Sequence, residues 1–164
     1  MSRSRHNRPP RGTAADAVFA AWDAERNAER QRLVSQIKAA FDGVELGSGT
    51  SLHQGRVLDD YQPEEAVRQA RSADTESRWQ EVTDEKVVTL WHALPFLDAE
   101  GFRFYIPRFM IYALHHHGTE TDSMASDSAI YAAHPGDASG RQSLLSGPQR
   151  EALRAFTEFF QDDR

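Results

Sequence analysis

The sequence feature that most constrains the fold is the concentration of aromatic side chains in residues 91–112. Seven of the sixteen aromatic residues of the chain fall within these 22 residues. Between residues 102 and 114 the only charged side chains are Arg103 and Arg108, which are too few to give the segment a solvent-facing side. An element of this composition has to be covered by other elements on most of its faces. The sequence therefore predicts one central element around which the rest of the chain packs.

The start of this segment allows two secondary structures. Apolar side chains at positions 102, 104 and 106 alternate with Arg103 and Tyr105, which is a strand pattern. The apolar pattern continues past Pro107 with helical spacing, which favours a helix, and both alternatives remain open at this point. In a helix, Pro107 cannot donate a hydrogen bond to the carbonyl of Arg103, so we expect a kink or a break into two helices there.

The rest of the chain carries helix patterns almost throughout. Residues 14–41 contain no Gly or Pro and are rich in Ala, Glu, Arg and Gln, which are good helix formers. Capping residues, Thr83 and Asp98 among them, together with apolar spacing and stop residues predict further helices at 63–72, 84–94, 98–117 and 147–160. We expect loops at the glycine-rich stretch 43–62 and at 134–147. The predicted fold class is mainly α, a single compact helical domain of about five to six helices with a Gly-rich loop.

The composition excludes several classes of protein and site. The 164 residues include no cysteine, which excludes thiol catalysis, iron–sulfur clusters, Cys-ligated zinc and a disulfide scaffold. A chain of this length buries roughly two-thirds of its unfolded surface, so it needs no structural metal to fold. The longest apolar runs are far shorter than the roughly 18 residues of a membrane span, and no apolar stretch follows the basic start as in a secretory signal. We therefore expect a cytoplasmic protein.

The charge of the chain is distributed unevenly. The formal net charge is −6, but Arg3, Arg5, Arg8 and Arg11 place four positive charges in the first eleven residues with no acidic residue among them. The remaining fifteen basic and twenty-five acidic residues give a net charge of −10. We expect residues 1–13 to be a disordered basic arm, because they have almost nothing to bury. The predicted helical domain then spans residues 14–164, with 14–29 as an N-terminal helical extension.

The central block also resembles a known family. Residues 96–107 are FLDAEGFRFYIP, similar to the FLDAEGFRFYLP-type motif of an uncharacterised bacterial family of unknown function, with Ile106 where Leu is usual. Members of that family typically show a Trp before the motif and a closing helix with the pattern Lt-x-x-Q-x-x-x-x-x-F. Trp79 and residues 145–156 match these two features. The resemblance covers about residues 30–162. It implies a small, mainly helical fold and carries no activity, cofactor or catalytic residue.

Five side chains in and near this motif are the candidate ligand-binding residues: His92, Glu100, Arg103, Tyr105 and Arg108. On a helix, Glu100 and Arg103 lie one turn apart, and an ion pair between them would fix how helices dock. Alternatively, Arg103 and Tyr105 reach into a pocket that holds an anionic or peptide ligand. A third alternative is an enzyme with His92 as its base. Because no pairing of a nucleophile with a base is visible, we assign no catalytic residue.

Two other patterns are weaker candidates for sites. Three consecutive histidines, residues 115–117, cannot all face one metal ion because consecutive helical side chains point about 100° apart, so we expect a helix-end and surface role. A zinc site would need His53, His92 or His134 together with a carboxylate. Residues 47–51 lack the lysine of a phosphate-binding P-loop. We predict neither a metal site nor a cofactor.

Three functions remain open. The preferred one is a protein-interaction module, such as an inhibitor, adaptor or immunity-type protein, that covers a basic partner with its acidic helical surface. Residues 59–60 and 64–65, Asp-Asp and Glu-Glu, are a candidate acidic patch on that surface. The second is a ligand-binding or enzymatic domain with a pocket around His92, Arg103 and Tyr105. The third is a nucleic-acid-associated protein tethered through the basic arm. We expect no membrane partner.

Overall fold

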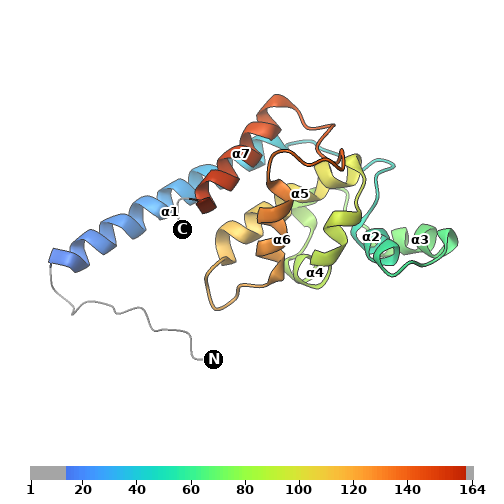
Figure 1. The fold of residues 1–164 in the computed structure, drawn as a ribbon, viewed down its shortest axis with the longest axis horizontal. Helices are drawn as coiled ribbons and strands as arrows, with labels where there is room; N and C mark the ends of the chain where they lie inside the picture. The colour runs from blue at the N-terminus through green and yellow to red at the C-terminus, as the bar shows by residue number, and fades with distance from the viewer. Residues whose placement is uncertain (1–13, 162–164) are drawn as a thin grey trace. The chain divides into compact units, whose positions relative to one another are not determined.

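The computed structural model describes residues 14–161 of the chain (Figure 1). The basic arm expected at residues 1–13 lies outside the described residues. The chain divides into two compact units, residues 1–32 and residues 33–164, and each is described here by itself.

The described residues form helices and no β-strand, which confirms the predicted mainly α fold with its compact helical domain. Residues 14–161 contain seven α-helices, where about five to six were expected, and three short 3-10 helices. The α-helices are α1 (Ala14–Ala40), α2 (Leu52–Asp59), α3 (Glu64–Ala70), α4 (Asp84–Thr89), α5 (Ala99–His116), α6 (Met124–Ala133) and α7 (Gly147–Gln161). The 3-10 helices are η1 (Arg71–Ala73), η2 (Trp79–Glu81) and η3 (Trp91–Phe96).

The aromatic segment forms α5, the central helix of residues 33–164. Residues 102–106 are helical, so the strand alternative is wrong. The helix also continues through Pro107, so of the two expected outcomes, a kink or a break into two helices, the break does not occur. Nearly every side chain from Phe102 to Leu114 is buried, and α5 packs most extensively against α6. Burial of this apolar surface outweighs the one backbone hydrogen bond that Pro107 removes.

Part of the stretch 43–62, predicted to be a loop, instead forms α2. Ser51 accepts a hydrogen bond from the amide of Gln54, and the Gln54 side chain accepts one from the amide of Ser51, which is a capping box. Gly55 lies inside this helix, where η3 leaves no room for a side chain: a β-carbon at position 55 would stand 2.9 Å from the carbonyl oxygen of Ala93. The glycine that suggested a loop is therefore a site of close packing between α2 and η3.

The helix predicted at 84–94 is also shorter than expected. Thr83 caps α4 through the amide of Lys86, as predicted, but α4 ends at Thr89. The chain then tightens into η3, which contains Pro95. A 3-10 turn tolerates this proline near its end and closes with the amide of Leu97 on the carbonyl of Leu94, 3.4 Å away.

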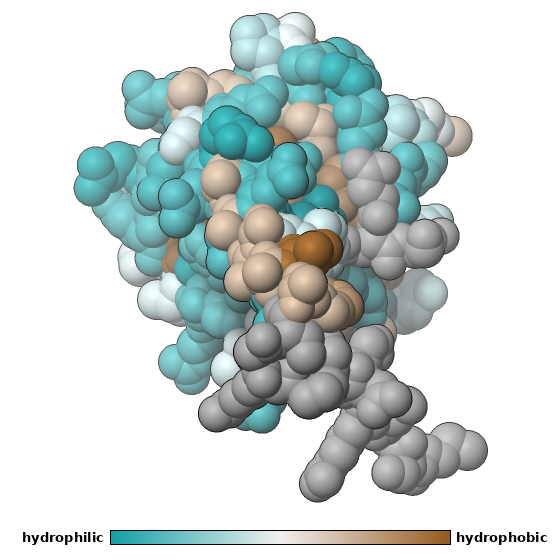
Figure 2. All heavy atoms as spheres, turned by 90° about the vertical axis from the view of Figure 1, so that its left-hand side faces the viewer, coloured by the Kyte–Doolittle hydropathy of each residue, from teal (hydrophilic) through white to brown (hydrophobic). Residues whose placement is uncertain are grey.

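The two units bury their apolar residues to different extents. Within residues 33–164, Leu33 and Ile37 at the end of α1 are buried in the core. Within residues 14–32, Val18, Phe19 and Trp22 are 69%, 57% and 55% exposed. Figure 2 shows apolar side chains gathered over the N-terminal end of α1. In residues 14–161, every helix falls short of the length or the hydropathy that crossing a membrane requires.

Candidate functional site

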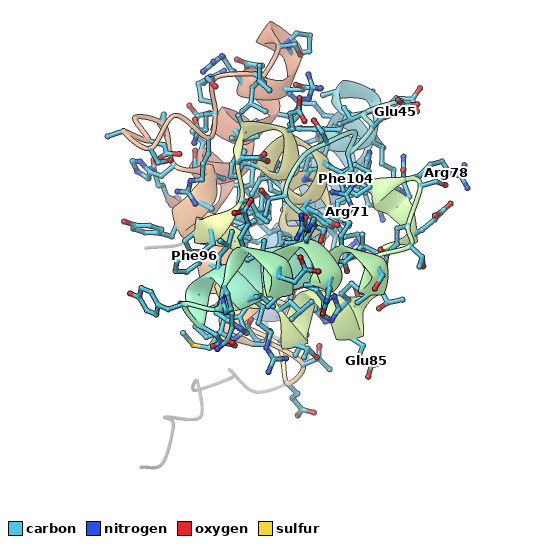
Figure 3. All side chains as sticks on the ribbon, turned by 90° about the vertical axis from the view of Figure 1, so that its right-hand side faces the viewer. Glu45, Arg71, Arg78, Glu85, Phe96 and Phe104 are labelled. Atoms are coloured by element: carbon cyan, nitrogen blue, oxygen red, sulfur yellow. The ribbon has the colours of Figure 1, made fainter. Side chains whose placement is uncertain are left out.

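One arginine, Arg71, holds the glycine-rich loop between α1 and α2 through the backbone of the loop. Arg71 donates from its two terminal nitrogens to the carbonyl oxygens of Gly47, 2.8 Å away, and Gly49, 2.5 Å away. Glu45 lies on the exposed side of the same loop, away from the Arg71 side chain (Figure 3). The loop is thus fixed although it contains glycine at left-handed backbone angles, as at Gly47 with a φ of +55°.

The start of α5 binds the other side of this loop. The Asp98 carboxylate caps α5 by accepting from the amide of Gly101 at 2.8 Å, and it also accepts from the amide of Thr50 at 2.9 Å. Glu100 accepts a hydrogen bond from the Ser48 hydroxyl, 3.0 Å away. These contacts assign a loop-holding role to the Asp-Ala-Glu-Gly part of the motif.

Arg103 is the polar residue of the motif that these contacts leave unexplained. Among the described residues no hydrogen-bond acceptor and no carboxylate within 4.0 Å pairs with Arg103, and its Nε is buried without a partner. The ion pair expected between Glu100 and Arg103 is not formed among the described residues, and the Glu100 carboxylate lies toward Ser48. A buried guanidinium nitrogen without an acceptor is unfavourable, so stability of the fold does not explain an arginine at position 103.

Arg103 and Glu100 line a surface pocket under the loop. The pocket has a volume of about 380 Å³, and its other walls come from the loop. The lining residues are Asp42, Gly43, Val44, Glu45, Leu46, Gly47, Glu100 and Arg103. The site therefore combines one cation with three carboxylates.

Tyr105 points into a different part of the molecule. Its ring is fully buried and its hydroxyl has no well-formed hydrogen bond among the described residues, although the backbone of Leu52 lies nearby. Burial raises the pKa of the Tyr105 hydroxyl, and the negative charges of Asp74 and Glu76 raise it further. Two positions along a helix correspond to about 200°, so Arg103 and Tyr105 face opposite sides of α5.

The last two candidate residues lie apart from the pocket. Arg108 donates from Nε to the carbonyl of Val82 at 2.7 Å and forms an ion pair with Asp84, which ties α5 to the start of α4. His92 is half-buried on η3, edge-on to the ring of Trp91 with centroids 5.7 Å apart. Of the five predicted site residues, the structure brings together Glu100 and Arg103.

A buried cluster of charged residues was missed at the level of sequence. Asp74, whose side chain is 1% exposed, accepts from Lys86 Nζ at 2.9 Å and from His53 Nδ1 at 2.8 Å. Lys86 also pairs with Glu76 at 2.5 Å. Burial raises the pKa of Asp74, but hydrogen bonds from His53, Ser51 and Lys86 outweigh it and leave the pKa below its usual 3.8. The cluster joins the segment before η2 to α2 and α4.

Two of the three consecutive histidines, His116 and His117, lie near different carboxylates. His116 stacks on Tyr112 with ring centroids 4.3 Å apart and lies 3.4 Å from Asp84. His117 lies 3.4 Å from Asp122. In the part of the chain that the structure describes, no group of three or more His, Asp or Glu side chains is arranged to hold a metal ion.

The turn between α2 and α3 presents an exposed aromatic side chain. The amide of Gln62 donates to the carbonyl of Val57 at 3.2 Å, and the amide of Tyr61 donates to that of Leu58 at 3.1 Å. This pair of bonds is a Schellman motif, whose left-handed position is usually glycine. Here Tyr61 occupies it with a φ of +56°, and its side chain is 93% exposed.

Acidic residues surround Tyr61 on both sides along the chain. We call residues 59–65, with Asp59, Asp60, Glu64 and Glu65, the acidic tip. Arg56 lies 4.0 Å from Asp60, and Arg68 pairs with Glu65. Asp59 and Glu64 make no ion pair within the described residues, so the tip keeps an excess of negative charge.

Comparison with protein-family models gives a match over most of the chain. The model of a family of unknown function, DUF6714, matches residues 29–163. The chain belongs to the DUF6714 family. This confirms the resemblance to a family of unknown function over nearly the span expected, whereas the motif attributed to the family remains a prediction. The exposed residues Val18, Phe19 and Trp22 lie outside the DUF6714 match. No curated protein and no solved structure matches the chain.

Proposed function

We propose that this protein is a protein-interaction module of the inhibitor, adaptor or immunity type, and that the acidic tip is its contact surface for a basic protein. The observation that carries the proposal is Tyr61. A left-handed backbone costs a non-glycine residue about 1–2 kcal/mol. The Tyr61 ring recovers little of this by packing, because 93% of the side chain is exposed. Residues held in sparsely populated backbone conformations cluster at functional sites.

The chemistry of the tip suits a basic partner. Tyrosine is enriched among residues that dominate binding energy, and its ring face attracts the guanidinium or ammonium group of a partner. Carboxylates around the ring favour the same cations and raise the association rate. Residues 33–164 carry twelve basic and twenty-one acidic residues, a net charge of −9, so the long-range field has the same sign as the tip.

Affinity capture with paired variants tests the proposal. The full chain is immobilised, and retained proteins from the native cell are compared for wild type, Tyr61→Asn and Asp59→Asn/Glu64→Gln. Tyr131→Asn on α6 is the matched control, since Tyr131 is 81% exposed on an ordinary helix. We expect one basic protein to be retained by wild type and Tyr131→Asn and lost from the other two variants. Equal retention by all four would rule out the tip as the contact surface.

The other two functions keep separate tests. The pocket lined by Arg103 and Glu100 is the observation that favours ligand binding. Nucleic-acid binding through Arg3, Arg5, Arg8 and Arg11 remains a prediction on residues outside the described part of the chain. We propose the cytoplasm of a bacterial cell as the location, as the sequence and the family resemblance suggest.

A further inference from the structure

We infer that the pocket under the glycine-rich loop binds a small zwitterionic ligand, an amino acid whose carboxylate pairs with Arg103 and whose ammonium group faces Glu45, Asp42 and Glu100. This binding site is distinct from the acidic tip and does not depend on the proposed protein interaction. It rests on the contacts of the lining residues and on the balance of charge among them.

Arg103 on the wall of the pocket lacks a partner within the described residues. Arg103 has no hydrogen bond or ion pair among the described residues, and its buried Nε lacks an acceptor. A partly buried arginine normally pairs with a carboxylate, and its planar fork of donors fits one in two parallel hydrogen bonds. The neighbouring Glu100 is engaged by Ser48 at 3.0 Å. A ligand carboxylate in the pocket would therefore pair with the terminal nitrogens of Arg103, which no described residue engages.

The other charged residues of the lining are acidic. Asp42, Glu45 and Glu100 line the same pocket as Arg103, which gives the site three negative charges and one positive charge. A phosphate dianion would be repelled by these carboxylates. A simple carboxylate would satisfy Arg103 alone, whereas a ligand that also carries an ammonium group pairs with both signs of charge.

Hydrogen bonds hold the walls of the pocket in place, and its size suits a small ligand. Arg71 holds the carbonyls of Gly47 and Gly49, and Asp98 ties Thr50 to the start of α5. A wall fixed in this way loses little conformational entropy when a ligand binds. The volume of about 380 Å³ is at the lower end of the range of small-molecule sites. An amino acid is a suitable size for it.

Titrations followed by ¹H–¹⁵N NMR of the full chain test the inference. The probes are L-lysine, glycine, acetate, methylamine and inorganic phosphate at equal ionic strength. We expect lysine and glycine to shift the amide resonances of Gly43 and Gly47, with lysine tighter because its extra charge suits the acidic walls. Acetate and methylamine, which each match half of the site, are expected to bind at least about tenfold more weakly.

Paired variants separate ligand binding from folding. Arg103→Lys and Glu45→Gln are each expected to weaken the binding of free L-lysine about tenfold or more. The Lys side chain at position 103 cannot form the two parallel hydrogen bonds of a guanidinium, and Gln at position 45 removes one negative charge from the pocket. Glu45 is exposed, so its substitution is not expected to affect folding. Arg78→Lys and Glu85→Gln, at exposed positions outside the pocket, are the matched controls and are expected to leave binding unchanged (Figure 3). Phosphate binding more tightly than glycine would overturn the inference, as would unshifted Gly43 and Gly47 amides with every probe.

Discussion

The backbone carbonyl of Thr50 lies against the α-carbon of Gly101, in the space that a β-carbon would occupy. The two groups in contact belong to the backbone of the loop and the backbone of the first turn of α5. The Asp98 carboxylate holds both segments by accepting hydrogen bonds from the amides of Thr50 and Gly101. Neither group can move without breaking the cap of α5.

Gly101→Ala is therefore expected to destabilise the protein by about 1–3 kcal/mol, the range found for forcing an extra carbon into a packed site. Urea unfolding followed by circular dichroism measures this change. Gly147→Ala is the control, because a β-carbon on Gly147 at the start of α7 would meet nothing within 4 Å. If both variants unfold at the same urea concentration, the loop does not press on α5 as described.

Part of the fold could be predicted from the sequence because it depends on short-range patterns. The aromatic spacing of α5 and the caps at Thr83 and Asp98 are local features, and each has the predicted role. The errors came from residues whose meaning depends on distant partners. Gly55 suggested a loop, but it lies inside a helix because η3 approaches it closely.

The candidate site was predictable only in part for the same reason. The motif pointed to Glu100 and Arg103, but the walls of their pocket come from a loop more than fifty residues earlier in the chain. The Asp74 cluster was missed because His53 and Lys86 are twenty-one and twelve residues away from it. Tyr61 was missed because a tyrosine gives no indication in the sequence that its backbone is left-handed.

Tyr61→Asn is expected to stabilise the protein while it removes partner binding. Asparagine adopts the left-handed region more readily than tyrosine, so part of the strain, up to about 1 kcal/mol, is released. The exposed ring gives up almost no packing in return. Thermal unfolding of Tyr61→Asn and of the control Tyr131→Asn measures the difference. A lower melting temperature for Tyr61→Asn alone would mean that the ring supports the turn.

The tryptophans at positions 22 and 79 are expected to respond differently to the same substitution. Trp79 is 1% exposed and donates its indole N–H to the carbonyl of Phe41 at 2.9 Å. Trp79→Phe removes this buried hydrogen bond and is expected to cost about 1–3 kcal/mol. Trp22 is 55% exposed, so Trp22→Phe is expected to change stability by less than about 0.5 kcal/mol. Urea unfolding of the two variants side by side makes the comparison, and a large effect of Trp22→Phe would contradict the exposure of that side chain.

The Asp74 cluster predicts how stability depends on pH. The pKa of Asp74 lies below its usual 3.8 in the folded protein, so the unfolded chain binds the proton more readily. The ionised carboxylate therefore contributes stability at pH values above about 4, and this contribution is lost as the pH falls through the folded pKa. Asp74→Asn removes one partner of a buried pair and is expected to cost roughly 3 kcal/mol at pH 7.

Urea unfolding of wild type and Asp74→Asn at pH 7, 5, 4, 3 and 2 tests this dependence. We expect the difference in unfolding free energy to stay constant down to about pH 4 and then to shrink, because the wild type then loses a charge that the variant lacks at every pH. Asp60→Asn is the control, since its carboxylate is 57% exposed on the acidic tip and its removal is expected to change stability by less than about 1 kcal/mol. A difference for Asp74→Asn that stays constant to pH 2 would show that its hydrogen bonds to His53 and Lys86 do not depend on the charge of Asp74.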